Sequence, residues 1–219
     1  MSTGTPGRPT LVDAARPAAA RRIVVVTAGL SEPSSTRLLA DLLGAAAVEA
    51  LEAQGGAELE VVELRPLAHA LTDALLTGFA TGDLARAQEA VASADAVIAV
   101  TPVFSASCSG LFKTFFDVLE PDTLDGTPVL VAATAGSARH SLVIEHALRP
   151  LFSYLHAVVV PTGVFAASED WGATGVDGAL RRRVDRAARE LADAISARPA
   201  LHRADPFGDV PDFGSLLGG

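Results

Sequence analysis

Residues 95–117, DAVIAVTPVFSASCSGLFKTFFD, combine a strand, a loop and a helix in one unit. The apolar run at 96–100 is typical of a strand that is buried on both faces. Small and hydroxyl residues follow at 101–107, and helical spacing of apolar residues begins at Ser109. Ligands of an open α/β sheet bind beyond the carboxyl end of a strand, where the next helix begins. The unit therefore predicts a ligand site at 101–107.

The same alternation of strands and helices extends along the chain. Strands are predicted at 23–27, 58–64, 96–100, 128–133 and 157–160. Helices are predicted at 36–54, 83–94, 109–119, 140–156 and 176–195. Helical crossovers make such strands parallel, and the mixture of Glu with Val and Leu at 58–64 favours an edge position. The pattern predicts an α/β fold: a flavodoxin-like three-layer sandwich with a five-stranded parallel sheet of order 2-1-3-4-5.

One of these helices contains a proline. Pro150 lacks an N–H, so the carbonyl of His146, four residues earlier, loses its helical partner. A kink or a π-type bulge is therefore predicted between these two residues, the alternative being a helix that ends at Arg149 and restarts.

Composition divides the chain into three parts and excludes some partners. A disordered leader is predicted at 1–20, a flavodoxin-like domain at 21–197 and a flexible C-terminal tail at 198–219, because the two ends lack periodicity. The net charge of −9 argues against a nucleic-acid partner. No apolar run reaches the roughly 20 residues of a membrane span. The single cysteine, Cys108, fits a reducing compartment, so we expect a cytoplasmic protein.

Three loops follow the first, third and fourth strands, and a parallel sheet brings them to one edge. The loop at 29–37 offers four hydroxyl groups, an arginine and a helix N-terminus, which suit a phosphate monoester. The loops at 101–107 and 133–141 are built from small residues, which allow a planar ring to approach the backbone. Each loop alone is also compatible with an ordinary cap or turn. Together they predict a site for a phosphorylated planar cofactor.

Three segments carry a family resemblance: TPVFSASCSGLFKTFFDVL at 101–119, ATAGSARHSLVIEHALRPLFSYLHA at 133–157 and PTGVFA at 161–166. They resemble the NAD(P)H-dependent FMN reductases of the flavodoxin-like superfamily, over about residues 22–170. The resemblance is greatest to reductases that supply reduced flavin to two-component monooxygenases, such as alkanesulfonate systems. Two departures stand out: Ala135-Gly136 replaces a Gly-Gly pair, and the basic residues near the phosphate are reduced to Arg37, with Glu32 beside it.

The resemblance implies a role for each loop in holding FMN. The residues implied at the phosphate are Ser31, Ser34, Ser35, Thr36 and Arg37. Those implied along the isoalloxazine ring are Pro102, Val103, Phe104, Ser105 and Ala106. Those implied at the pyrimidine edge and rim are Thr134, Ala135, Gly136, Ser137 and His140. No catalytic side chain and no metal ligand is implied.

The implied activity is an NAD(P)H:FMN oxidoreductase. Hydride would pass from NADPH or NADH to flavin N5, and reduced FMN would go to a partner monooxygenase. Two alternatives use the same residues: an FMN-retaining quinone, azo or chromate reductase, and a flavodoxin-type electron carrier, which the scarcity of aromatic residues in the loops disfavours. The resemblance also implies a homodimer or homotetramer, with 67–82 as the candidate contact.

Overall fold

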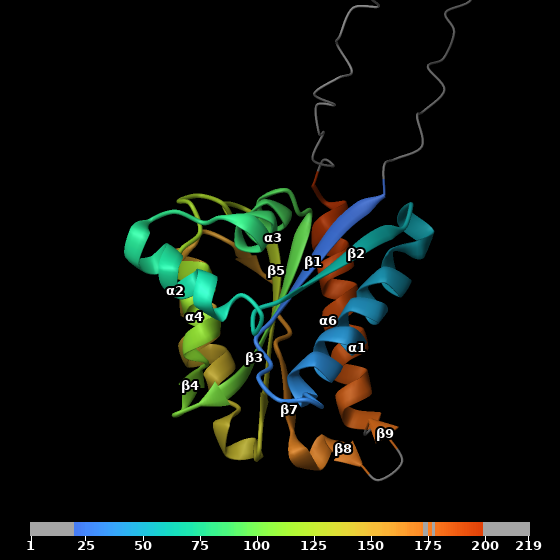
Figure 1. Ribbon diagram of the computed structural model, residues 1–219. Helices are drawn as coiled ribbons and strands as arrows, with labels where there is room; N and C mark the ends of the chain where they lie inside the picture. The colour runs from blue at the N-terminus through green and yellow to red at the C-terminus, as the bar shows by residue number, and fades with distance from the viewer. Residues whose placement is uncertain (1–19, 173–174, 177, 199–219) are drawn as a thin grey trace, which may run out of the picture.

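The computed structural model describes residues 20–172, 175–176 and 178–198. A central sheet separates two helical layers (Figure 1). One layer consists of α1 (Ser35–Leu51) and α6 (Gly178–Ser196), and the other of α2 (Ala68–Thr77), α3 (Gly82–Ala92), α4 (Gly110–Asp117) and α5 (Arg149–Tyr154). The predicted leader, except Ala20, and the predicted tail, except Arg198, lie outside the described residues. No helix of the described part is long and apolar enough to cross a membrane.

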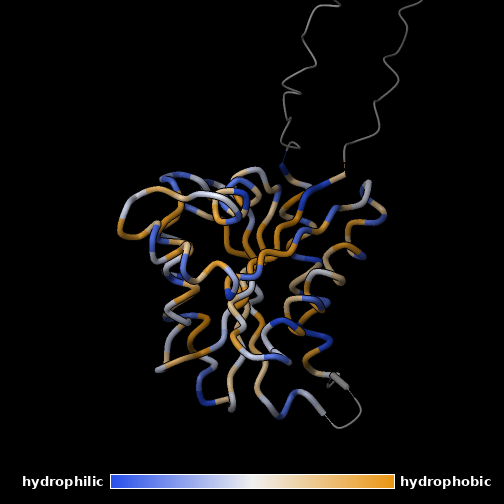
Figure 2. Tube along the Cα trace, viewed as in Figure 1, coloured by the Kyte–Doolittle hydropathy of each residue, from blue (hydrophilic) through white to orange (hydrophobic). Residues whose placement is uncertain are grey.

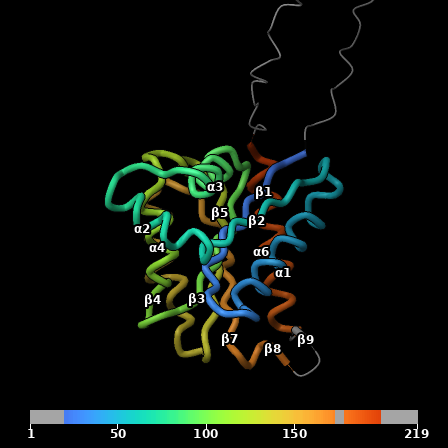
Figure 3. Tube along the Cα trace, viewed as in Figure 1, coloured from blue at the N-terminus to red at the C-terminus, as the bar shows by residue number. Residues whose placement is uncertain are grey.

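The elements alternate as the sequence predicts. The strands are β1 (Arg21–Thr27), β2 (Ala57–Glu63), β3 (Ala96–Phe104), β4 (Ser107–Cys108), β5 (Pro128–Ala135), β6 (Val158–Val159), β7 (Val164–Ala167), β8 (Trp171–Gly172) and β9 (Gly175–Val176). The α-helices are α1 (Ser35–Leu51), α2 (Ala68–Thr77), α3 (Gly82–Ala92), α4 (Gly110–Asp117), α5 (Arg149–Tyr154) and α6 (Gly178–Ser196). Short 3-10 turns stand at Glu52–Gln54, Ala138–His140 and Ser168–Asp170. Figure 3 follows this path from end to end.

The main sheet confirms the predicted class and order but not the predicted number of strands. Its parallel path is β2-β1-β3-β5-β6, which is the order 2-1-3-4-5 with β2 at the edge. The sheet has seven strands rather than five, because β4 pairs with β3 and β7 pairs with β5. β5 pairs with β6 only through Pro128 and Val129, and then with β7 from Ala132 onward. The strand predicted at 157–160 is β6, whereas β7 is a further strand that the sequence did not predict. Pro161, which cannot donate to a ladder, lies between them.

Alternate side chains of the buried strands enter two separate cores. Ile23 and Val25 pack with α1 and α6, whereas Val24 and Val26 pack with the helices of the other layer. The pattern follows from the two-residue period of a strand and explains the continuous apolar run. In Figure 2 the central strands are correspondingly hydrophobic along their length. The sheet is thus a rigid support whose polar loops lie at its ends.

The predicted irregularity before Pro150 is confirmed as a π-helical segment, Ile144–Leu148. The N–H of Arg149 bonds the carbonyl of Ile144, and α5 continues the helix with the proline in its first turn. The Arg149 side chain donates to the carbonyl oxygen of Val160 at 3.0 Å and also to that of Pro161. This arginine therefore holds the connection between β6 and β7 against the π segment.

Candidate functional site

The stretch 101–107 forms a β-hairpin, where the sequence predicted a loop. β3 continues to Phe104, and Ser107 and Cys108 pair back against it. Ser105 (φ 49°) and Ala106 (φ 64°) make the turn, a two-residue geometry that matches the right-handed twist of the strands. The usual Asn-Gly signal of such a turn is missing from the sequence, which is why the hairpin was not predicted. Left-handed φ values cost a residue with a side chain roughly 1–2 kcal/mol, so the neighbouring structure holds this turn in place.

Two hydroxyl groups fix the base of the hairpin. The buried hydroxyl of Thr101 accepts the N–H of Ser109 at 3.0 Å and donates to the carbonyl of Pro102 at 2.9 Å. Ser109 in turn caps α4, because its hydroxyl accepts the N–H of Phe112 at 3.1 Å. Thr101 lies in the predicted ligand loop but was given no role of its own there, and Ser109 was predicted only as the start of the helix. Both position the hairpin relative to the N-terminus of α4.

Thr134 is the residue at which the three predicted loops meet. Its hydroxyl lies 2.8 Å from the hydroxyl of Thr36, and both side chains are buried. Thr134 also lies opposite Pro102 in the parallel pairing of β5 with β3. The structure therefore brings together the first turn of α1, the end of β3 and the end of β5 at one edge of the sheet.

The buried threonine pair makes a stability prediction. Thr36→Val leaves the hydroxyl of Thr134 buried without this partner, so we expect the free energy of unfolding to fall by about 1–3 kcal/mol. Adding Thr134→Val removes the orphaned hydroxyl, so the double variant should lose less than the sum of the two single losses. Urea denaturation of the four proteins measures this coupling. Strictly additive losses would contradict a hydrogen bond between the two side chains.

The loop before α1 offers donors rather than free charge. Ser34 caps α1 by accepting the N–H of Arg37 at 3.2 Å, and Ser31 and Ser35 are exposed. The first N–H groups of a helix have no intrahelical acceptor, so those of Ser35 and Thr36 are directed beyond the helix end. A Cβ at Gly29 would stand 2.2 Å from the Ser34 hydroxyl oxygen, so a side chain there would displace the group that caps α1. The hydroxyl and N–H donors fit a phosphate group.

Arg37 is already engaged by carboxylates. Its Nε lies 2.7 Å from Asp41, and its guanidinium also pairs with Glu63. Beyond it, Arg65 pairs with Glu32 at 2.7 Å. Glu63 is the last residue of β2 and Arg65 follows that strand, so both lie at the carboxyl end of β2 and at the same edge of the sheet. The predicted site did not include them, because it was drawn from the loops after the first, third and fourth strands.

The third loop presents small groups and an exposed rim. Ala135 is half-buried at the end of β5, and a Cβ at Gly136 would meet open space. Ser137 precedes the 3-10 turn Ala138–His140, and the side chain of His140 is exposed. Phe104 is 47% exposed on the neighbouring hairpin. The small side chains of the third loop leave its backbone accessible to a flat ring.

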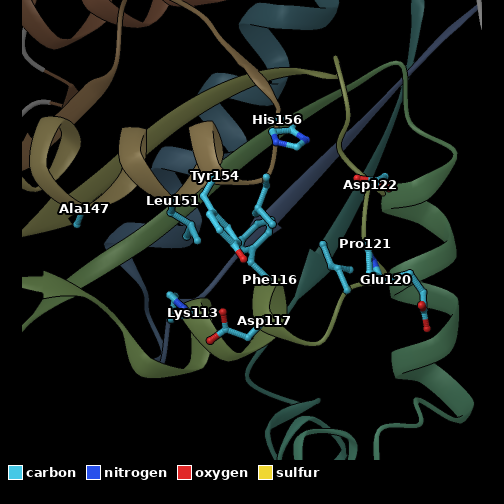
Figure 4. A pocket seen from close by; sticks show the side chains of 12 residues that line it. Lys113, Phe116, Asp117, Glu120, Pro121, Asp122, Ala147, Leu151, Tyr154 and His156 are labelled. Carbon is cyan, nitrogen blue, oxygen red and sulfur yellow. Dashed lines mark hydrogen bonds and ion pairs between the residues drawn. The ribbon is translucent and has the colours of Figure 1, made fainter.

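A cavity of about 780 Å³ lies away from these loops. It is bounded by α4 and α5, with Phe116, Leu151, Tyr154 and His156 among its lining residues (Figure 4). The cavity is also lined by residues 119–122, which precede β5, and by His156, which precedes β6. It therefore lies toward the amino ends of the strands. Ligands of open α/β sheets bind at the carboxyl ends. This cavity is therefore not the predicted cofactor site.

Known proteins resemble the chain along most of its length. Residues 21–172 match the family model of NADPH-dependent FMN reductases. The chain is 36% identical over 183 residues to the NADH-dependent FMN reductase SfnE of Pseudomonas putida, covering 83% of this chain and 96% of that protein. It is 35% identical over 181 residues to an FMN reductase (NADPH) of Pseudomonas aeruginosa, covering 82% and 95%.

Solved structures show the same similarity. An oxidoreductase from Corynebacterium diphtheriae superposes with a TM-score of 0.78 at 48% identity, covering 82% of this chain and 99% of that one. The apo form of the NADH:FMN oxidoreductase EmoB superposes with a TM-score of 0.71 at 27% identity, covering 85% and 97%.

Proposed function

The chain belongs to the family of NADPH-dependent FMN reductases, and from this premise we propose that it supplies reduced FMN to a partner monooxygenase. Membership makes it an NAD(P)H-dependent FMN oxidoreductase with a flavodoxin-like fold. Supply of a monooxygenase goes further, and two observations support it: the resemblance to flavin-supplying reductases, and the charge balance of the phosphate loop. The single cysteine fits the cytoplasm, the compartment that we propose for the reaction.

Each loop has a physical task in this proposal. The hydroxyl groups of Ser31, Ser34 and Ser35 and the first N–H groups of α1 bind the phosphate of FMN. The hairpin and the third loop would line the ring, and their backbone N–H groups would be the donors available to its pyrimidine edge. Bound FMN supplies the hydride acceptor, and NAD(P)H supplies the hydride. The protein contributes orientation and exclusion of water, and no side chain needs to move a proton.

Release of the product is favoured by one observation above all. Arg37, the predicted cation of the phosphate loop, is paired with two carboxylates, Asp41 and Glu63. A phosphate dianion therefore meets neutral donors beside a cluster of one guanidinium and two carboxylates, whose net charge is negative, and this limits the affinity for FMN. A reductase that releases reduced FMN to a partner enzyme needs such moderate affinity.

An anaerobic filtration experiment tests the supply of reduced FMN. Protein, excess NADPH and FMN are mixed without oxygen and passed through a membrane that retains the protein. We expect reduced FMN in the filtrate in proportion to the NADPH consumed. Reduced flavin that stays with the protein, and turns over only when a quinone or an azo dye is added, would favour the FMN-retaining alternative.

We further propose that the chain forms a homodimer or homotetramer through the segment 67–82. Leu75, Leu76 and Phe79 are 56%, 80% and 77% exposed on α2 and the turn after it. Single exposed apolar residues are common, whereas three large ones exposed within five positions of the chain favour an interaction site. α2 packs beside α4, in the layer opposite α1 and α6.

The apolar segment makes a prediction about mass in solution. The double variant Leu76→Glu/Phe79→Glu should lower the molar mass measured by light scattering from that of an oligomer to about that of one chain, because charged groups are poorly tolerated in an interface core. The control variant Glu49→Gln, at an exposed position of α1 in the opposite layer, should leave the mass unchanged. An unchanged oligomer in the double variant would contradict the proposed contact.

A further inference from the structure

The end of the site beside β2 carries more negative than positive charge. Three carboxylates meet two guanidiniums there, and both guanidiniums are already paired: Arg37 with Asp41 and Glu63, and Arg65 with Glu32. These residues lie in the loop before α1, in the first two turns of α1, at the end of β2 and just after it. An anionic ligand other than FMN is therefore repelled from this end of the site.

The third loop, which follows β5, lies toward the other end of the site. In the sheet β5 is separated from β2 by β1 and β3, and three spacings of about 4.8 Å place the two strands about 14 Å apart. At physiological ionic strength, salt screens exposed charges over about 8 Å. The carboxylates beside β2 therefore have little effect on a charge carried by the third loop.

Arg139 gives the third loop a positive charge that no carboxylate engages. It is exposed in the 3-10 turn Ala138–His140, and within residues 20–172, 175–176 and 178–198 it forms no ion pair. The neighbouring strand β7 is followed by two acidic residues. Asp170 is paired with Arg183 at 2.9 Å, and Glu169 is exposed and does not pair with Arg139. The Arg139 guanidinium is therefore available to an anionic ligand.

The reaction brings one anionic ligand besides FMN. NADH carries the two phosphates of its pyrophosphate, and NADPH carries a further phosphate on the 2′ oxygen of its adenosine. The planar guanidinium of an arginine matches a phosphate through two parallel hydrogen bonds. The exposed hydroxyl of Ser141, two residues beyond Arg139, is a further donor on the same loop. Because the phosphate of FMN is assigned to the N-terminus of α1, Arg139 remains for the nicotinamide nucleotide.

We propose that Arg139 binds a phosphate group of NAD(P)H and so orients the nucleotide with its phosphates toward the third loop and away from β2. The inference rests on the proposed binding of FMN at the three loops, because the flavin phosphate then occupies the other end of the site. Arg139 holds the hydride donor at a distance from the reacting atoms. Its contact is equal in the ground state and the transition state, so its loss raises KM and leaves kcat unchanged.

Steady-state kinetics at saturating FMN test the proposal. Arg139→Gln removes the charge and keeps most of the bulk, so we expect KM for NADPH to rise about tenfold, the size of one lost charge-assisted hydrogen bond. The kcat should change less than about twofold. Calorimetric titration of the full chain with NADP⁺ should show the same rise in Kd without any turnover. Arg139→Lys keeps the charge but not the planar fork, and should recover part of the loss.

Comparison of the two nucleotides identifies the phosphate that Arg139 binds. A tenfold effect on KM for NADPH with little effect on KM for NADH assigns the contact to the 2′-phosphate, and an equal effect on both assigns it to the pyrophosphate. Arg186 of α6 is also exposed and forms no ion pair in the described ranges, so Arg186→Gln should change neither KM.

Two results would overturn the assignment of Arg139. One is that Arg139→Gln leaves both KM values within about twofold of those of the unmodified chain. The other is that it raises the Kd for FMN as much as KM for NADPH, because the arginine would then act on the flavin. A chain that oxidises neither nucleotide in the presence of FMN would instead overturn the proposed function.

Discussion

Replacing Ser35 with glutamate is expected to raise the Kd for FMN about 100-fold without lowering thermal stability. Ser35 is exposed and is the first residue of α1, whose first turn carries no acidic side chain. At about 4 Å a carboxylate and one phosphate charge repel by about 1 kcal/mol in water and about 4 kcal/mol near a protein surface. A tenfold change in Kd corresponds to about 1.4 kcal/mol. The same carboxylate interacts favourably with the helix dipole, by about 0.3–1 kcal/mol.

Ser35→Glu should weaken FMN binding without destabilising the fold, so weaker binding could not be attributed to unfolding. Ser35→Gln has the same bulk without the charge and should change the Kd for FMN much less. Riboflavin, which lacks the phosphate, should bind the Ser35→Glu variant as it binds the unmodified protein. If glutamate weakened riboflavin and FMN equally, or left FMN binding intact, the phosphate would not lie at the N-terminus of α1.

Phe152→Ala is expected to lower the free energy of unfolding by about 3–5 kcal/mol. Phe152 is fully buried on α5, and its ring centroid lies 4.9 Å from that of Phe116 and 6.3 Å from that of Phe112. The substitution removes these ring contacts and leaves a cavity behind the π segment. A whole domain is stabilised by about 5–15 kcal/mol, so the loss is a large share. Urea denaturation at fixed protein concentration measures it.

The neighbouring position on the same helix provides the control. Ser153 is exposed, and Ser153→Ala should change the free energy of unfolding by less than about 0.5 kcal/mol. A loss below about 1 kcal/mol in Phe152→Ala would mean that the aromatic cluster packs loosely and that the π segment does not depend on it.

What the sequence predicted well depends on local chemistry or on strong apolar runs. The buried strands β1, β3 and β5 and the edge position of β2 follow from the distribution of Val, Ile and Glu, which is set by burial alone. The π segment follows from the missing N–H of Pro150, a property of one residue. The position of the three loops at one edge follows from the parallel connectivity.

What the sequence did not predict depends on tertiary contacts. The hairpin at 103–108 turns through Ser105 and Ala106, which carry no hairpin signal, and its base is fixed by Thr101 eight residues before Ser109. β7 is a separate strand because Arg149 holds the carbonyls before it. Such contacts join residues distant in the sequence, so periodicity and composition do not reveal them.

The most direct measurement of the central function is the oxidation of NADPH and NADH by the purified protein with and without added FMN. The family and the site predict a rate that increases with FMN and saturates, with reduced FMN formed in step with the nicotinamide oxidised when oxygen is absent. The Ser35→Glu variant should need about 100-fold more FMN to reach half of its maximal rate. The function would be contradicted if the protein oxidised neither NADPH nor NADH faster than the reaction without protein, at any FMN concentration.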